Sequence, residues 1–234
     1  MRKTILAAVV LVLVCGVAFA QSSDYEEEGW KKRFASPTYG ISLATLTIDY
    51  NDNGEVQEDD ILVPGIDIRI FNGINVAKRG GFYTGYEVGT IIYLLGESES
   101  YDINGTGYQI RDLVSGSIFI MSKYGYRIDF GTEAGGFSVG LGLGIGAKMG
   151  GGSVDVYNED SGETQSAGSE AFGPMLEAAL EAAFRLGQNF RILGQLGGYV
   201  SPASLEWDSD DATKIGGEFA PVRPDLRFGF ALNY

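Results

Sequence analysis

Apolar and polar residues alternate along most of the chain, which is the period expected of a β-strand with one apolar face. In each alternating segment one face is aliphatic or aromatic, and the other carries glycine, serine or charged residues. The pattern predicts eight strands, at residues 38–50, 61–71, 82–95, 110–122, 137–150, 172–186, 190–205 and 219–234. We therefore expect an all-β protein.

Two segments fit this pattern less simply. In 38–50, Tyr39 and Ile41 have one parity while Leu46 and Ile48 have the other, so we expect a β-bulge there. Segment 172–186 is rich in alanine and also fits a helix, with charges at i, i+4 spacing. The strand interpretation is preferred, because a membrane barrel closes with an even number of strands.

The polarity of the two faces predicts where the apolar side points. The polar faces are too small or too charged to build a dense core, so the apolar faces are expected to contact lipid around a polar lumen. The predicted fold is an eight-stranded antiparallel up-and-down transmembrane β-barrel. Longer connections at 51–60, 96–109, 151–171 and 206–218 hold most of the acidic residues, and turns at 72–81, 123–136 and 187–189 alternate with them. With both termini periplasmic, the acidic loops are extracellular.

The first residues have the form of a secretory signal. Arg2 and Lys3 precede an apolar run that ends in Ala-Phe-Ala at 18–20, a signal-peptidase pattern. We expect a signal peptide at 1–20, a periplasmic lead-in at 21–37 and the barrel at 38–234. Cleavage removes Cys15, the single cysteine, and takes the net charge from −14 to −16, because two basic and no acidic residues are lost. So acidic a protein is not expected to bind nucleic acid.

The last segment ends in five alternate hydrophobic positions, Leu226, Phe228, Phe230, Leu232 and Tyr234. It resembles the β-signal of bacterial outer-membrane barrels, and the chain as a whole resembles the small OmpA/OmpX-like class. The resemblance implies location in the bacterial outer membrane, contact with its lipids, and recognition by periplasmic chaperones and the barrel-assembly machinery. It implies no defined activity.

The residue inventory restricts catalysis. The chain has no histidine, which excludes a Ser-His-Asp unit, a histidine base and a histidine-bound zinc site. On one strand Glu177 and Glu181 would lie about 13–14 Å apart, too far for a glycosidase pair. We predict no catalytic residue, no cofactor and no enzyme.

Charged residues of both signs fall on the inward faces, which predicts a polar network in the lumen. A filled lumen is the preferred interpretation, because an eight-stranded interior is about wide enough for side chains alone. The glycines of 137–150 would leave space for long side chains from the opposite wall. The predicted network is Asp67, Arg69, Glu87, Glu177, Glu181, Arg185, Arg191 and Arg227.

Residues 49–60 partly match an EF-hand calcium loop, although Asp60 replaces the usual glutamate at the last position. Asn53-Gly54 within the same stretch is also a strong type I′ hairpin signal, and the hairpin is the preferred interpretation. Divalent cations bridging the acidic loops remain a second possibility.

Three hypotheses for function follow. The first is a non-enzymatic outer-membrane barrel with acidic extracellular loops and a structural or surface-interaction role. The second is a narrow channel for small solutes, as an OmpW-like resemblance implies. The third is a soluble periplasmic ligand-binding barrel.

Overall fold

The computed structural model describes residues 33–75, 81–98, 100–131, 135–187, 189–201, 206–208 and 215–233. The predicted signal peptide, residues 21–32 of the lead-in, and Tyr234 of the predicted assembly signal lie outside the described residues. No helix within the described ranges is long and apolar enough to cross a membrane.

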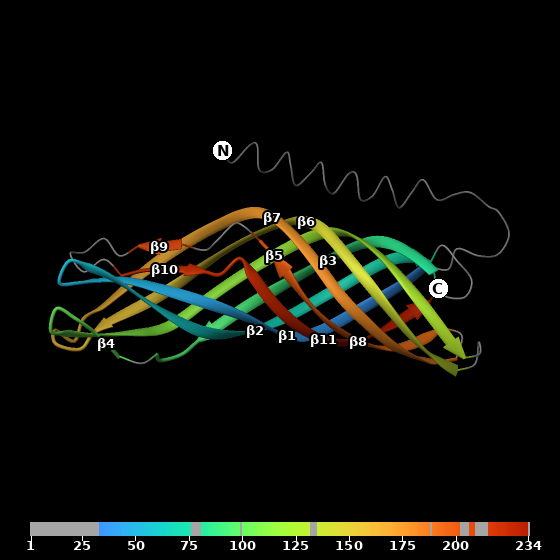
Figure 1. The fold of residues 1–234 in the computed structure, drawn as a ribbon, viewed down its shortest axis with the longest axis horizontal. Helices are drawn as coiled ribbons and strands as arrows, with labels where there is room; N and C mark the ends of the chain where they lie inside the picture. The colour runs from blue at the N-terminus through green and yellow to red at the C-terminus, as the bar shows by residue number, and fades with distance from the viewer. Residues whose placement is uncertain are drawn as a thin grey trace.

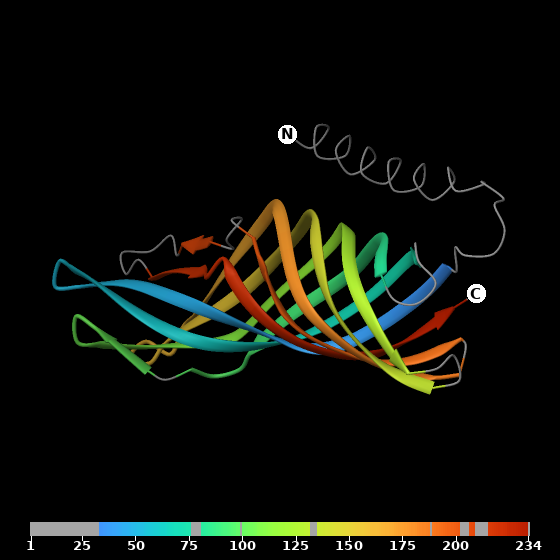
Figure 2. The same ribbon diagram turned by 45° about the vertical axis from the view of Figure 1, so that its right-hand side comes forward.

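Eight antiparallel strands close into a ring in the order β1–β2–β3–β5–β6–β7–β8–β11, and β11 pairs back with β1. This closed ring confirms the predicted fold class, and its tilted strands are visible in Figures 1 and 2. Three short strands extend it, because β4 pairs with β5, β10 with β1, and β9 with β10. The bounds are β1 Arg33–Asp52, β2 Glu55–Asn75, β3 Gly81–Leu95, β4 Ser100–Ile103, β5 Thr106–Gly131, β6 Gly135–Asn158, β7 Thr164–Leu186, β8 Phe190–Val200, β9 Glu206–Asp208, β10 Ile215–Phe219 and β11 Val222–Asn233.

Six of the eight ring strands are longer than the sequence pattern predicted, whereas β8 ends at Val200, before the predicted end at 205. β1 begins at Arg33, so the last five residues of the predicted lead-in belong to the barrel wall. β5 runs to Gly131 and β6 starts at Gly135, so most of the predicted turn at 123–136 is strand. β6 continues to Asn158 and β7 begins at Thr164, so most of the predicted loop at 151–171 is also strand. Polar outward residues hid these extensions from a search for apolar alternation.

The predicted final strand is interrupted. β10 pairs with the later part of β1 and β11 with its earlier part, and Ala220 and Pro221 lie between them. The Ala220 amide donates to the Thr45 carbonyl at 2.8 Å, which keeps the break attached to β1. Proline lacks an amide donor, so a break in the ladder at Pro221 is the expected local result.

Two tight turns define one end of the barrel, which we call the hairpin end. Asn53 and Gly54 have φ values of 52° and 87° between paired Asp52 and Glu55, as in a type I′ turn. Residues 49–60 therefore form a β-hairpin, which was the preferred interpretation. Asn104-Gly105 closes the β4–β5 hairpin with the same signs of φ. The opposite end, where Phe34 pairs with Asn233, is called the terminal end (Figure 1).

No bulge separates the two halves of β1. Its register with β2 runs without a shift from Arg33 opposite Ile74 to Asp52 opposite Glu55, so the predicted bulge is wrong. Tyr39 points outward and Leu46 inward in one regular strand. The apolar residues instead move from outward to inward positions because the environment of the strand changes along its length. Toward the terminal end the outside is apolar, whereas toward the hairpin end the inside is apolar and the outside polar.

An apolar belt covers the outside of the wall toward the terminal end. Its members are large hydrophobic side chains that point away from the lumen and are exposed, as lipid-facing residues must be. β7 contributes to this belt as a strand, so the helical alternative is wrong. Examples are Ile41, Ile66, Ile68, Ile70, Ile118, Leu143, Ile145, Leu180, Phe184, Leu196 and Phe228.

The interior is filled in layers. A large apolar cluster packs inside the barrel toward the hairpin end, and it includes Leu46, Ile48, Ile91, Val154 and Phe219. A smaller apolar cluster lies toward the terminal end, at Phe34, Phe71, Tyr83, Ala183, Leu193 and Ala231. The prediction of a polar lumen is therefore correct only in part, because buried charged side chains share the interior with these two apolar clusters.

Candidate functional site: a charged layer across the lumen

The polar layer is organised around the guanidinium of Arg69, which points inward from β2. Its Nη2 atom lies 2.5 Å from Asp67 Oδ2 and 3.1 Å from Asp225 Oδ2, and its Nη1 atom lies 3.1 Å from Glu87 Oε1. Arg69 also pairs with Glu177 of β7. All these side chains are at most 2% exposed. Arg69 thus joins four carboxylates from four strands.

Two further cations complete the layer. Arg227 of β11 lies 3.0 Å from both Glu177 Oε1 and Asp225 Oδ1. Lys123 Nζ of β5 lies 3.2 Å from Glu177 Oε1, 3.3 Å from Glu87 Oε2 and 3.6 Å from Glu181 Oε1. We call this set the lumen charge layer: Asp67, Arg69, Glu87, Lys123, Glu177, Glu181, Asp225 and Arg227. Its three cations and five carboxylates give a net charge of −2.

The structure places the eight predicted network residues in two groups. Six of them meet in the lumen charge layer. The other two, Arg185 and Arg191, lie nearer the terminal end with Arg127 and Asp129, in what we call the arginine cluster. The sequence interpretation missed Lys123, Arg127, Asp129 and Asp225. The first three were assigned to a turn, although Tyr124, Tyr126 and Ile128 continue the alternation between them.

The glycines of β6 provide the space that the charged side chains occupy. A Cβ atom built on Gly142 would lie 2.9 Å from the Tyr83 hydroxyl, 3.0 Å from Lys123 Cε and 3.1 Å from Glu181 Oε1. A Cβ on Gly144 would lie 2.5 Å from Met121 Sδ and 3.3 Å from Glu177 Cβ. This matches the predicted role of the glycines of 137–150. They have no side chains, which leaves space for the long side chains of other strands.

Aromatic rings cover the layer on the side of the hairpin end. The Arg223 guanidinium lies 5.3 Å from the centroid of Phe219, 5.6 Å from that of Tyr93 and 5.7 Å from that of Tyr199. The Tyr93 hydroxyl is 2.7 Å from Ser42 Oγ and 2.6 Å from the Tyr199 hydroxyl. All three rings belong to the larger apolar cluster, so this cluster contributes the aromatic cover.

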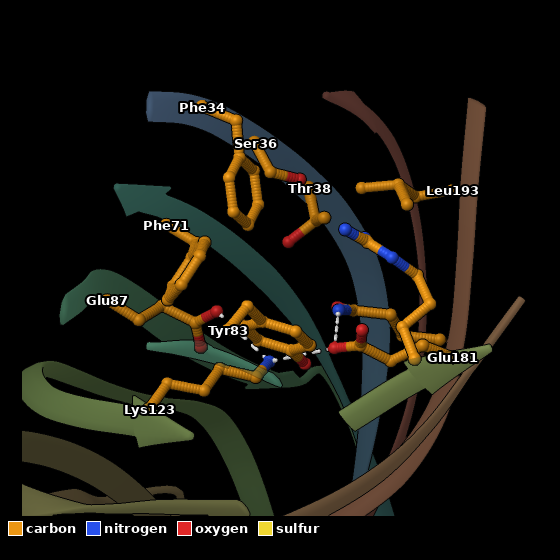
Figure 3. Close-up of a pocket in the computed structure, with 11 residues that line it drawn as sticks. Phe34, Ser36, Thr38, Phe71, Tyr83, Glu87, Lys123, Glu181 and Leu193 are labelled. Carbon is orange, nitrogen blue, oxygen red and sulfur yellow. Dashed lines mark hydrogen bonds and ion pairs between the residues drawn. The ribbon is translucent and has the colours of Figure 1, made fainter. Parts of the chain in front are cut away.

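A small cavity of about 20 Å³ lies on the other side of the layer. Figure 3 shows Phe34, Phe71 and Tyr83 around it, with Lys123 between Glu87 and Glu181. Within the described part of the chain, Ser36 Oγ and Thr38 Oγ1 line it without a hydrogen-bond partner. Its volume suits about one water molecule, which those hydroxyl groups would bind.

The layer has no arrangement that indicates a reaction. Its carboxylates are paired with arginine and lysine, and no group of three or more Asp, Glu, His or Cys side chains in the described ranges could hold a metal ion. What this layer does physically is fill the barrel: charged side chains from five of its eight strands meet at its centre.

Comparison with known proteins gives similarity to outer-membrane barrels. No protein-family model matches the chain, and no curated protein matches its sequence. The similar solved structures include the following three. Ail of Yersinia pestis is 16% identical with a TM-score of 0.35, covering 81% of this chain and 97% of Ail. A major outer membrane protein of Thermus thermophilus is 12% identical with a TM-score of 0.42, covering 84% and 99%. OprG of Pseudomonas aeruginosa is 11% identical with a TM-score of 0.40, covering 88% and 98%.

The geometry of the chain itself defines its class. A closed ring leaves no unpaired strand edge in hydrocarbon, and an exposed apolar belt around a filled interior suits lipid and not water. The protein is a small transmembrane β-barrel of the kind found in bacterial outer membranes. The belt speaks against the soluble periplasmic barrel, whose outside would be polar.

Proposed function

We propose that the protein is a non-enzymatic outer-membrane barrel whose lumen is closed and whose function is to bind basic partners at its hairpin end. The main support for a closed lumen is the order of the layers inside the barrel. An apolar cluster, the lumen charge layer and a second apolar cluster follow one another along the axis, and their side chains are almost fully buried. A solute path would have to break both packing and ion pairs.

The outside of the hairpin end is acidic. Among the described residues, Arg111 is the basic side chain on this outer surface, and it packs on the Tyr157 ring at 3.8 Å. A surface of one sign attracts partners of the opposite sign and raises their association rate. We call this set the acidic outer surface: Glu55, Glu58, Asp59, Asp60, Glu97, Asp102, Asp112, Glu159, Asp160, Glu163, Glu170 and Glu218.

This surface is held by strands and not by loose loops. The two hairpin tips are joined, because the Asn53 amide donates to Asn104 Oδ1 at 2.7 Å. The rings of Tyr50 and Tyr101 lie 5.8 Å apart just behind the tips. Ser100 also donates to Glu159 between hairpins. A surface ordered before binding loses less conformational entropy on binding, which favours a recognition role.

The test compares binding with conduction. The folded barrel is titrated with fluorescent polylysine at low salt, together with a variant that carries Glu58→Gln, Asp59→Asn and Asp60→Asn. We expect the variant to bind at least about threefold more weakly, and added salt to weaken binding of the unaltered protein. The matched control, Glu26→Gln with Glu27→Gln and Glu28→Gln, changes the net charge equally in the predicted lead-in and should bind like the unaltered protein.

Planar-bilayer recording tests the channel alternative. We expect no steady single-channel current from the unaltered barrel. A reproducible conductance that scales with salt concentration would contradict the closed lumen, and equal polylysine binding by both triple variants would contradict the role of the acidic outer surface.

A further inference from the structure

We propose that the arginine cluster at the terminal end is a binding site for a phosphate group. This site lies at the opposite end of the barrel from the acidic outer surface and does not depend on its function. Arg127 and Asp129 come from β5, Arg185 from the end of β7 and Arg191 from the start of β8. All four side chains point into the barrel, near the turns that close this end.

In the described ranges the cluster holds three arginines and one carboxylate. Arg127 Nε lies 3.7 Å from Asp129 Oδ1, Arg191 Nη2 lies 3.8 Å from Asp129 Oδ2, and Arg185 also pairs with Asp129. Among the described residues this leaves a net charge of +2. These side chains are only 6–15% exposed, so water compensates that charge poorly.

The backbone register adds to this repulsion. Arg185 and Arg191 are direct cross-strand partners on β7 and β8. Like charges at directly opposite positions destabilise a sheet, and among the described residues Asp129 is the carboxylate that lies near both arginines. One carboxylate at 3.8 Å from Arg191 is too distant to accept a hydrogen bond from it.

Two donors in this cluster point to the missing ligand. In the described part of the chain, the Nε atoms of Arg127 and Arg191 are buried and donate no hydrogen bond. Arg127 is held in place by other contacts: its Nη2 donates to Asn75 Oδ1 at 2.8 Å, and the guanidinium lies 5.5 Å from the Tyr83 ring centroid. Its free donor is therefore fixed in direction before any ligand arrives.

Phosphate is the anion that fits these features. Arginine presents a planar fork of donors that matches phosphate oxygens, and several arginines can share one phosphate. A phosphate monoester carries close to two negative charges at neutral pH, which equals the excess charge of the cluster. The same chemistry is available from a soluble phosphate in the periplasm or from a lipid headgroup.

Isothermal titration calorimetry on the folded barrel in dodecyl maltoside tests the site. Sodium phosphate is titrated at constant ionic strength into the unaltered protein, into Arg191→Gln, and into the matched control Arg111→Gln at the hairpin end. We expect saturable binding of one phosphate per chain for the unaltered protein and for Arg111→Gln. Arg191→Gln should bind at least about tenfold more weakly, because it loses a charge-assisted donor.

Absence of saturable heat with the unaltered protein, or equal affinity in Arg191→Gln, would overturn the proposal. If Arg191→Gln does not fold, Arg191→Lys keeps the charge but loses the fork, and it should still bind more weakly. A second titration with dihexanoyl phosphatidic acid identifies the source. Affinity at least tenfold above that for inorganic phosphate assigns the site to a lipid headgroup, and equal or weaker affinity assigns it to a soluble phosphate.

Discussion

Replacing Arg69 with methionine removes the cation on which the lumen charge layer depends. Arg69 contacts four buried carboxylates, and its loss changes the layer from three cations against five carboxylates to two against five. The net charge of the layer moves from −2 to −3. Removing one partner of a buried ion pair costs about 3–5 kcal/mol, because the remaining charge has no compensation and little water. We expect a loss of this size in the free energy of unfolding.

Urea unfolding of the barrel in lipid vesicles, followed by tryptophan fluorescence, measures this loss. Glu177→Gln is then combined with Arg69→Met to form a double-mutant cycle. With Arg69 absent, neutralising Glu177 relieves repulsion between carboxylates. Glu177→Gln should therefore reduce the free energy of unfolding by at least about 1 kcal/mol less in the Arg69→Met protein than in the unaltered protein. Arg111→Met, at a partly exposed arginine, should change stability by no more than about 0.5 kcal/mol. A loss below about 1 kcal/mol for Arg69→Met, or additive costs in the cycle, would refute this account.

Three further predictions concern the wall and its assembly. Gly142→Val should lower the free energy of unfolding by about 1–3 kcal/mol, because the valine side chain enters space filled by charged residues. The control Gly116→Val should be nearly neutral in the same urea assay, because a Cβ atom at Gly116 has no other atom within 4 Å. Ile68→Arg should destabilise the barrel in vesicles by about 2–4 kcal/mol if the belt contacts lipid. No such loss in detergent-free bilayers would place Ile68 outside the membrane. Tyr234→Ala should slow folding in the presence of purified barrel-assembly machinery while leaving unassisted folding in detergent unchanged, and equal rates with the machinery would argue against a terminal assembly signal.

The lipid-facing half of the barrel was predictable because the alternation of apolar and polar residues is visible within each strand by itself. Ile66, Asp67, Ile68 and Arg69 alternate between lipid and lumen, and the chain repeats that period on every strand of the ring. The same rule failed past the belt, where Thr47 faces outward and Leu46 and Ile48 face the interior. Where the outside of the wall contacts water instead of lipid, the apolar residues of a strand point inward. The alternation still has a period of two residues.

The layering of the lumen was not predictable from the sequence. Glu177 reaches Arg69 across 108 residues of chain, and which inward positions share a height depends on how far each strand is shifted against its neighbour. Alternation gives the direction of a side chain but not its height along the axis. The sequence therefore placed these charges on one face of each strand, but it could not divide them into the lumen charge layer and the arginine cluster.

The unbroken register between β1 and β2 has a mechanical consequence. One ladder of paired residues runs from the terminal end, through the apolar belt, to the Asn53-Gly54 tip. A partner that pulls on this tip does not stretch a flexible tether, since the hydrogen-bonded ribbon passes the load into the wall that carries Arg69. Force applied at this tip would thus reach the ion pairs of the lumen charge layer through backbone hydrogen bonds.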